Sequence, residues 1–520
     1  MFSLIADPWL PAIDRSGQHR KISPRQIFDN DIVELAWPRA DFQGAAYQLL
    51  IGLMQTTIPP RDKQEWDDIW DDGIEPTCWH EALEGVAEAF NFGPQKPAFL
   101  QDFDTLPVES SSISGLLVDA PGGNTLKLNK DHFVKRSLYQ QFCPHCAAMA
   151  LYTVQTNSPA AGAGFRTSMR GGGPMTTLLM PRQKDAALWR KIWLNVMPTR
   201  DEWQKEQLPL IFPWLAATRS SETPKNIVTP ENSHALQAYW GMPRRLEIDF
   251  SQTQPGECDL CGEMHESLLT KIRSKNYGVQ YDSWTHPLSP YRRAAKDIAA
   301  PMIPLKGQPG GLAYKDWLGL VVESEEKLNC TFPAKVVRMN TVPKLTHLWC
   351  FGYDMDNAKA RCWYEHHLAL STLPKEHQAE LKDLLQLAVE LATGTLPLLR
   401  YALKEAWFET PKEAKGDFGF IDTAFWQQTE ADFSALWKSL NQYPSATQPE
   451  AREALRLWHT SLRDYLFQAF DERAFTNPDD VADLTRILRA RLNLNKNFNK
   501  QKCLKVLLQQ THECEEKQDV

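Results

Sequence analysis

Four cysteines in two C-x-x-C pairs are the residues of this chain best suited to bind a metal ion. The pairs are Cys143-Pro144-His145-Cys146 and Cys258-Asp259-Leu260-Cys261. Two intervening residues let one tight turn direct both sulfurs of a pair at the same ion, and four thiolates complete the tetrahedral shell that Zn²⁺ prefers. Because such a shell leaves no open position, the pairs predict a structural zinc site that joins two distant segments.

The motifs of common catalytic zinc sites and of nucleotide hydrolysis are missing from the sequence. No H-x-E precedes Cys143, although a zinc deaminase needs one to supply a ligand and a general acid/base. There is also no H-E-x-x-H and no G-x-x-x-x-G-K-[ST]. His145 and His265 lie close enough along the chain to replace a cysteine ligand. Four unbonded buried thiols are the alternative to a metal site.

Basic residues next to each cysteine pair point to a negatively charged partner. After the first pair, Gly162, Gly164 and Gly171–Gly173 permit close backbone approach to a ligand, and Arg166 and Arg170 could clamp phosphates. After the second pair, basic residues alternate along an extended segment at Lys271, Arg273 and Lys275. Taken alone, these motifs are more typical of an ordinary flexible loop and a solvated strand face.

Charge is distributed unevenly along the chain, whose net charge is −8. Residues 124–170 carry six Lys/Arg against one Asp, and residues 481–505 carry seven against one. Two basic patches on an acidic body suit a subunit that touches nucleic acid locally and protein elsewhere. Solvated basic faces explain each patch, taken alone, equally well.

The elements that must position these residues fall into two parts, because 520 residues are too many for one core. Apolar residues at helical spacing mark a helix around residues 42–54 that ends before Pro59-Pro60, and another from Leu138 to Gln155 that carries the first cysteine pair. Residues 236–350 are typical of strands and loops. After residue 374, helical spacing begins anew near four apolar residues, Leu381, Phe433, Leu455 and Leu484.

We therefore expect an α+β protein. Its parts are a large mixed α/β domain with the structural zinc over residues 1–374, a C-terminal four-helix bundle over residues 375–510 and a frayed tail over residues 511–520. No apolar run reaches the roughly 18 residues of a membrane span. The first residues lack the basic start of a secretory signal, and the other six cysteines have no paired spacing. These features predict a cytoplasmic protein without a membrane partner.

A series of motifs in a fixed order resembles the large subunit of the type I-E CRISPR surveillance complex, Cascade. Besides the two cysteine pairs, the series contains Asp7-Pro8-Trp9-Leu10-Pro11, Trp37-Pro38-Arg39, Gly164-Phe165-Arg166, Arg170-Gly171-Gly172, Pro174-Met175-Thr176-Thr177 and Trp284-Thr285-His286-Pro287-Leu288-Ser289-Pro290. It runs along nearly the whole chain, and the order is more specific than any single motif.

The resemblance implies a subunit without a catalytic site. Such a subunit reads the protospacer-adjacent motif (PAM) of double-stranded DNA from the minor groove and starts strand separation for guide pairing. The family's glycine-rich loop matches Ala160, Ala161, Gly162, Ala163 and Gly164, with Ala163 where the family has glycine. Its lysine finger matches Lys275. Its polar wedge matches Asn357 beside Asp356, where the relative compared has Gln.

The resemblance also implies partners. Lys127 and Asn129 match a loop that contacts the 5′ handle of the guide RNA, and Arg166 is a further candidate contact. The basic helix with Arg486, Arg489 and Arg491 would suit a DNA backbone or the small subunit of Cascade. The further partners that the resemblance implies are other Cascade subunits and the helicase-nuclease that degrades the DNA. A zinc-dependent nucleic-acid-processing enzyme is the alternative, and an open metal position beside a carboxylate would favour it.

Overall fold

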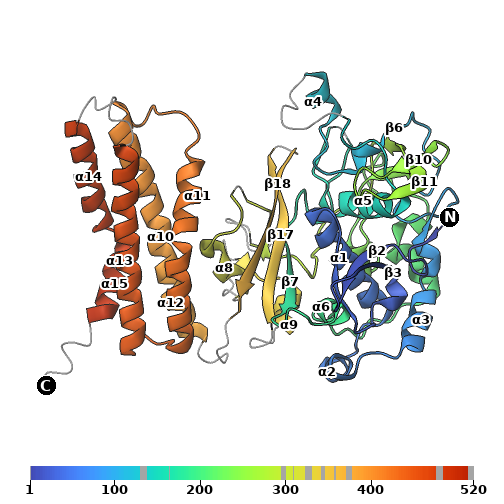
Figure 1. The fold of residues 1–520 in the computed structure, drawn as a ribbon, viewed down its shortest axis with the longest axis horizontal. Helices are drawn as coiled ribbons and strands as arrows, with labels where there is room; N and C mark the ends of the chain where they lie inside the picture. The colour runs from blue at the N-terminus through green and yellow to red at the C-terminus, as the bar shows by residue number, and fades with distance from the viewer. Residues whose placement is uncertain are drawn as a thin grey trace. The chain divides into compact units, whose positions relative to one another are not determined.

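The computed structural model describes residues 2–128, 137–162, 164–293, 300–308, 310–321, 331–340, 346–356, 359–370, 378–475 and 484–512. By its internal contacts the chain divides into two units, each made of two segments (Figure 1). The first unit contains Met1–Gly311 and Glu323–Ala369, and the second contains Leu312–Val322 and Leu370–Val520. The segment Leu312–Val322 thus groups with the C-terminal helices, which the boundary expected at residue 374 does not foresee.

The first unit mixes helices with small sheets, as the sequence predicts. The two-stranded sheets pair β1 (Phe2–Ser3) with β5 (Asn91–Phe92), β10 (Thr253–Glu257) with β11 (Met264–Leu269), and β13 (Gln280–Tyr281) with β8 (Ile227–Val228). Two three-stranded sheets have the strand orders β3 (His19–Ile22), β2 (Leu10–Asp14), β4 (Ile32–Leu35) and β6 (Ser111–Ser112), β12 (Lys271–Lys275), β9 (Arg245–Ile248). Two further three-stranded sheets have the orders β15 (Ile303–Pro304), β14 (Tyr291–Arg292), β16 (Thr331–Phe332) and β18 (Lys359–Ala369), β17 (Thr346–Asp356), β7 (Thr176–Pro181). Its helices are α1 (Ala40–Thr57), α2 (Lys63–Asp72), α3 (Pro76–Glu84), α4 (Gly123–Lys127), α5 (Pro144–Asn157), α6 (Leu188–Trp193), α7 (Leu208–Ile211) and α9 (Lys335–Asn340).

Helix α1 is buried along nearly its whole length and confirms the helix expected from the apolar spacing. It ends at Thr57, before Pro59-Pro60, as predicted. Glycine is required on two of its faces. A Cβ on Gly44 would lie 2.7 Å from the Phe351 ring of β17, and a Cβ on Gly52 would lie 2.9 Å from Tyr239. These close approaches let α1 pack against elements far along the chain.

Buried tryptophans fill the core of the first unit, and several of their indole N–H groups donate to backbone carbonyls. Trp9 donates to Leu4 at 2.8 Å, and Trp214 donates to Ala89 at 2.7 Å. Burying such large side chains removes much apolar surface from water, while the hydrogen bonds avoid leaving the indole N–H unpaired.

The hairpin of β17 and β18 is the longest strand pair described, and it is antiparallel with β7 on the outer side of β17. Its register ends at the pair Asp356 and Lys359. On β17, the Tyr353 hydroxyl donates to the buried Asp41 carboxylate of α1 at 2.5 Å. This bond anchors the hairpin to the core helix.

The second unit contains helices throughout its described residues. They are α8 (Tyr314–Val321), α10 (Gln378–Trp407), α11 (Gly419–Gln428), α12 (Glu430–Gln442), α13 (Pro449–Ala474), α14 (Leu484–Phe498) and α15 (Lys502–His512). The four predicted stretches are helical. In addition, α8 packs into this unit because Tyr314 stacks on Phe433 with ring centroids 4.3 Å apart and Trp317 contacts Trp437 at 4.4 Å.

Two sequence-based expectations about local structure are wrong. The helix with the first cysteine pair begins at Pro144, not at Leu138, because Cys143 is its N-cap and proline is favoured at the first helical position. Residues 236–350 hold not only strands and loops but also α8 and α9. These two helices are short, so their apolar spacing is too brief to distinguish from buried strands.

Candidate functional site

The four cysteines of the two pairs come together in the first unit. Cys143 caps α5 and Cys146 lies in its first turn, while Cys258 and Cys261 lie in the turn between β10 and β11. Cys143, Cys146 and Cys258 are buried and Cys261 is half-buried. All four sulfurs lie within 4.8 Å of one another.

The geometry of this four-cysteine cluster fits a tetrahedral metal ion. The sulfurs of Cys143 and Cys261 are 3.8 Å apart. Zn–S bonds of about 2.3 Å in a tetrahedron place sulfurs about 3.8 Å apart. Backbone N–H groups also donate to sulfur, from Cys143 to Cys258 at 3.2 Å and from Cys146 to Cys143 at 3.4 Å. Such donors stabilise thiolates, which are the metal-binding form.

Hydrogen bonds between neighbouring thiols shift the pKa values of different cysteines in the cluster in opposite directions. Hydrogen bonding with Cys143, followed by Cys146, lowers the pKa of Cys258 well below its usual range. Hydrogen bonding with Cys143, followed by Cys258, raises the pKa of Cys146. The second pair therefore deprotonates more readily than Cys146, and a bound cation would compensate the charge.

The backbone around the cluster joins its two segments. Phe142 and Leu269 form an isolated antiparallel bridge with N···O distances of 2.9 and 2.8 Å. The Asp259 carboxylate accepts from the backbone N–H groups of Gln140 at 2.5 Å and Gln141 at 2.9 Å. The turn that contains the second pair is therefore fixed to the residues before the first pair.

A second group of potential ligands, Cys143, His145 and His265, shares one cysteine with the cluster. Burial and then the charges of Lys21 and His265 lower the pKa of His145 to about 4. However, Lys21 Nζ lies 3.3 Å from His145 Nδ1 and also pairs with Glu263. A lysine beside that nitrogen disfavours a cation there, so the four sulfurs are the better ligand set.

The glycine-rich loop leaves α5 and returns where Ser168 N donates to Ser158 O at 2.9 Å. Ala160, Ala161 and Gly162 are exposed at its tip, and Gly162 has φ +62° with open space around it. Ala163 lies outside the described residues. Gly164, with φ +79°, accepts from Tyr277 N at 2.8 Å. The loop therefore presents backbone at the surface, as close approach to a ligand requires.

Lys275 ends strand β12, two residues before Tyr277, and is half-buried. Its Nζ lies 3.7 Å from Glu222 Oε1, so the two form a loose ion pair. Arg273 on the same strand contacts Asp249 at 2.8 Å. The Arg273 ion pair is short and holds that side chain in the fold, whereas the contact between Lys275 and Glu222 is longer.

Tyr277 is a residue that the sequence analysis missed. It adopts φ +60° and is 39% exposed. Its carbonyl accepts from Ser220 Oγ at 3.0 Å, and its ring lies 3.0 Å from the position of a Cβ on Gly164. A non-glycine residue in the left-handed region stores strain, which the surroundings must offset. The adjacent Gly278 is the only sequence signal for a tight turn here.

The two arginines of the glycine-rich loop do not form a pair of phosphate clamps. Arg170 is 3% exposed and donates to Thr176 at 3.0 Å, to Ser289 at 3.1 Å and to Gln48. The expectation that it clamps phosphates is wrong, because its guanidinium is used inside the core. Arg166 is half-buried and donates to Ser221 Oγ at 2.8 Å, so it remains within reach of the surface.

Two candidate contacts with nucleic acid, Asn129 and Asn357, lie outside the described residues. Lys127 is exposed at the end of α4. Asp356, the neighbour of Asn357, is exposed at the end of the β17–β18 hairpin.

The basic helix α14 uses its arginines in different ways. Arg491 forms a two-point ion pair with Asp471 at 2.7 and 2.8 Å, and this hydrogen bonding raises its pKa. Arg486 donates to Ala406 O at 3.1 Å, and Arg489 is exposed. Of the three, Arg489 is the one that is exposed. Across the part of the chain that is described, none of the helices combines the length and apolar character that crossing a membrane requires.

Comparison with known proteins identifies the family. A family model for the CRISPR-associated protein Cse1 matches residues 3–469. The Cse1 structure from Thermobifida fusca is 16% identical, with TM-score 0.68, and the match covers 96% of this chain and 98% of that one. CasA (Cse1) from Thermus thermophilus is 16% identical, with TM-score 0.67 and coverage of 96% and 99%.

A chain of a solved CRISPR RNA-guided surveillance complex is also similar, at 15% identity and TM-score 0.61, with coverage of 95% and 99%. At these identities the structural likeness shows a shared fold, whereas the family model rests on the sequence itself. Because that model spans most of the 520 residues, the chain belongs to the CRISPR-associated protein Cse1 family, as its series of motifs predicts.

Proposed function

We propose that this chain is the PAM-recognition subunit of an RNA-guided DNA surveillance complex of type I-E, and that it has no catalytic site. One observation carries the proposal. The hydrogen bond from Tyr277 N to Gly164 O, 2.8 Å long, holds the glycine-rich loop beside the end of the strand that carries Lys275. Two segments distant in the sequence, each matching a groove-reading device of the family, thereby meet at one surface.

The chemistry of these two segments suits the minor groove of double-stranded DNA. Exposed backbone at Ala160, Ala161 and Gly162 can approach the groove floor without a large side chain in the way. Lys275 supplies a cation on an alkyl stem that reaches acceptors on base edges. Because the minor groove distinguishes mainly A·T from G·C, such contacts give a relaxed motif preference. To reach the groove, Lys275 must leave Glu222.

We assign strand separation to Asn357, which lies between Asp356 and Lys359 in the sequence. A wedge that enters the duplex must disrupt stacking, at a cost of a few kcal/mol that binding at the motif must offset. Guide pairing then reads the target sequence, as in other RNA-guided effectors. We assign contact with the 5′ handle of the guide RNA to Lys127 and Asn129, with Arg166 as a further nucleic-acid contact.

The other partners follow from the same proposal. The second unit, as a four-helix bundle, would contact the DNA backbone or the small subunit through Arg489. The subunit would act in the cytoplasm with other Cascade subunits and present a surface to the helicase-nuclease. In the first unit, Zn²⁺ in the four-cysteine cluster would hold two segments together and take no part in chemistry.

The alternative, a zinc-dependent nucleic-acid-processing enzyme, has weaker support. It needs an open metal position with a free carboxylate nearby. Four sulfurs close the coordination shell, and two neighbouring carboxylates are engaged, Glu263 by Lys21 and Asp259 by backbone N–H groups. These contacts favour a structural ion.

The proposal is tested by binding of target duplex to the guide-RNA core complex, with and without this chain at fixed salt. The duplexes carry either a matched or a scrambled flanking motif. We expect the chain to add affinity only with the matched motif. The recognition role would be contradicted if the chain added equal affinity for both duplexes or added no affinity for either. Hydrolysis of the duplex by the chain alone would favour the enzyme.

A further inference from the structure

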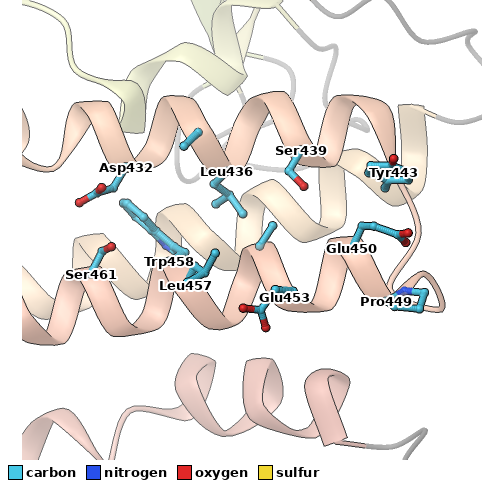
Figure 2. A pocket seen from close by; sticks show the side chains of 12 residues that line it. Asp432, Leu436, Ser439, Tyr443, Pro449, Glu450, Glu453, Leu457, Trp458 and Ser461 are labelled. Atoms are coloured by element: carbon cyan, nitrogen blue, oxygen red, sulfur yellow. The ribbon is translucent and has the colours of Figure 1, made fainter.

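An apolar groove lies between α12 and α13 of the second unit, and its lining contains none of the residues assigned above. It encloses about 700 Å³. Figure 2 shows side chains of the two helices facing one another across it, with Asp432 opposite Ser461 at one end and Tyr443 opposite Pro449 at the other. The two helices therefore run antiparallel, and the groove follows their axes.

Both walls of the groove are single helix faces. On α12 and its C-cap the lining residues are Asp432, Ala435, Leu436, Ser439 and the capping residue Tyr443, and on α13 they are Pro449, Glu450, Glu453, Ala454, Leu457, Trp458 and Ser461. Spacings of three and four residues place each set on one side of its helix. At 1.5 Å per residue, the α12 face is about 16 Å long, which matches about three turns of another helix.

The floor of the groove leaves apolar surface in contact with water. Leu457 is 52% exposed, and Ala435 is exposed. Small side chains such as Ala435 and Ala454 permit the close approach of a third helix. An exposed leucine alone is ordinary, but an apolar stripe shared by two helices is typical of a docking surface.

The charges that line the groove indicate the charge that a binding partner should carry. Its lining contains Asp432, Glu450 and Glu453 and neither lysine nor arginine. Glu453 pairs with Arg456, whereas Asp432 and Glu450 form no ion pair within the described residues. Residues 513–520 of this chain carry four acidic residues and one lysine, so their charge has the same sign as the rim. The complementary partner is therefore basic and is not this terminal segment.

We propose that this groove is the docking site for an amphipathic helix of another protein, with an apolar stripe of about three turns flanked by Lys or Arg. The leucine or methionine side chains of that helix would cover Leu457 and Ala435, the exposed apolar residues of the groove. Its cations would lie against Asp432 and Glu450. This surface goes beyond DNA recognition, because it would attach a protein to the helical unit.

The test uses the full chain and a fluorescent helical peptide of about 14 residues, with Leu and Ala at positions i, i+3, i+4 and i+7 and Lys at the flanks. A peptide with the same stripe and Glu at the flanks is the charge control. Fluorescence anisotropy at fixed salt gives both Kd values. We expect the Lys peptide to bind at least about tenfold more tightly than the Glu peptide.

Matched variants locate the binding. Leu457→Lys should weaken the Lys peptide about tenfold, whereas Leu488→Lys on α14, where the leucine is 49% exposed, should change its Kd less than about twofold. Asp432→Lys with Glu450→Lys should reverse the preference between the two peptides. Asp383→Lys with Glu409→Lys adds the same charge at exposed residues that do not line the groove, and should not reverse the preference.

Three results would overturn the proposal. The first is that the Lys peptide does not bind. The second is equal loss from the groove variants and their controls, which would indicate adsorption to an acidic protein. The third is concentration-dependent self-association in sedimentation that Leu457→Lys abolishes, which would place a second copy of the chain in the groove.

Discussion

Tyr277 N donates to Gly164 O at 2.8 Å, and the Tyr277 ring occupies the space beside the Gly164 Cα. Both residues have positive φ, +60° and +79°. The glycine-rich loop and the segment that follows β12 are thus joined by one backbone hydrogen bond between two residues with unusual backbone conformations. This hydrogen bond fixes the distance between the glycine-rich loop and the segment that follows Lys275.

Comparing alanine substitutions at Gly164 and Gly162 should separate the effect of backbone strain from the effect of a steric contact with Tyr277. Gly164→Ala would force alanine into the left-handed region and bring its Cβ to 3.0 Å from the Tyr277 ring and N. Gly162→Ala meets similar strain at φ +62° but open space. We expect Gly164→Ala to lose about 1–2 kcal/mol more stability in urea unfolding and to bind matched duplex more weakly. Equal stability loss in both variants would mean that the Tyr277 contact is unimportant.

Lys275 and Glu222 should have opposite effects on DNA binding. Lys275→Ala removes the proposed groove contact, so the Kd for matched duplex should rise about tenfold. Glu222→Gln removes the carboxylate 3.7 Å from Lys275 Nζ and should lower the Kd. Titrations with assembled complex measure both, with the exposed Lys184→Ala as control. A loss of affinity in Glu222→Gln would indicate that the ion pair positions the lysine.

Asn357→Ala should slow strand opening more than initial binding, since a wedge acts after the motif is engaged. Stopped-flow fluorescence of a base analogue beside the motif reports opening, and anisotropy reports binding. If both steps weaken equally, Asn357 contributes to docking and not to separation.

The four-cysteine cluster should make stability depend on metal. Cys143→Ser removes one ligand, so its melting temperature should fall by more than about 5 °C, and a chelator should have little further effect. Cys350→Ser is the matched control, because Cys350 is also buried but lies outside the cluster. Its melting temperature should still fall with chelator. An insensitive wild-type protein that contains no metal by elemental analysis would remove the structural ion.

His347 should destabilise the fold in mild acid. Burial, followed by the charge of His367, lowers its pKa from 6.5 to about 4. Between these values the unfolded chain binds more protons at this residue, so the free energy of unfolding falls as pH drops through the window. His347→Gln should reduce the difference in stability between about pH 7 and about pH 5, whereas the exposed His19→Gln should not. Urea unfolding at both pH values measures the difference.

The sequence predicts those parts of the site that depend on local spacing. Each C-x-x-C pair forms one turn, so its two sulfurs converge whatever the rest of the fold does. The loop glycines were expected to permit close backbone approach to a ligand, and Gly162 is exposed with open space around it. The meeting of the two cysteine pairs was also foreseeable, because one closed metal shell requires four ligands.

Residues whose role depends on distant partners could not be assigned this way. Arg170 resembled a phosphate clamp within its loop, but Gln48 and Ser289, far along the chain in both directions, draw it into the core. Tyr277 had no catalytic or binding motif to mark it. Helix α8 was missed because its aromatic partners, Phe433 and Trp437, follow more than a hundred residues later.

The grouping of Leu312–Val322 with Leu370–Val520 has a consequence for biosynthesis and for truncation. During synthesis, α8 leaves the ribosome well before the helices that cover Tyr314 and Trp317. These two aromatic rings therefore lack their packing partners until the C-terminal third of the chain has been made. A fragment that begins at Leu370 would lack α8 and expose Phe433 and Trp437 to water. A single protease cut at that boundary would likewise leave α8 covalently attached to the first unit.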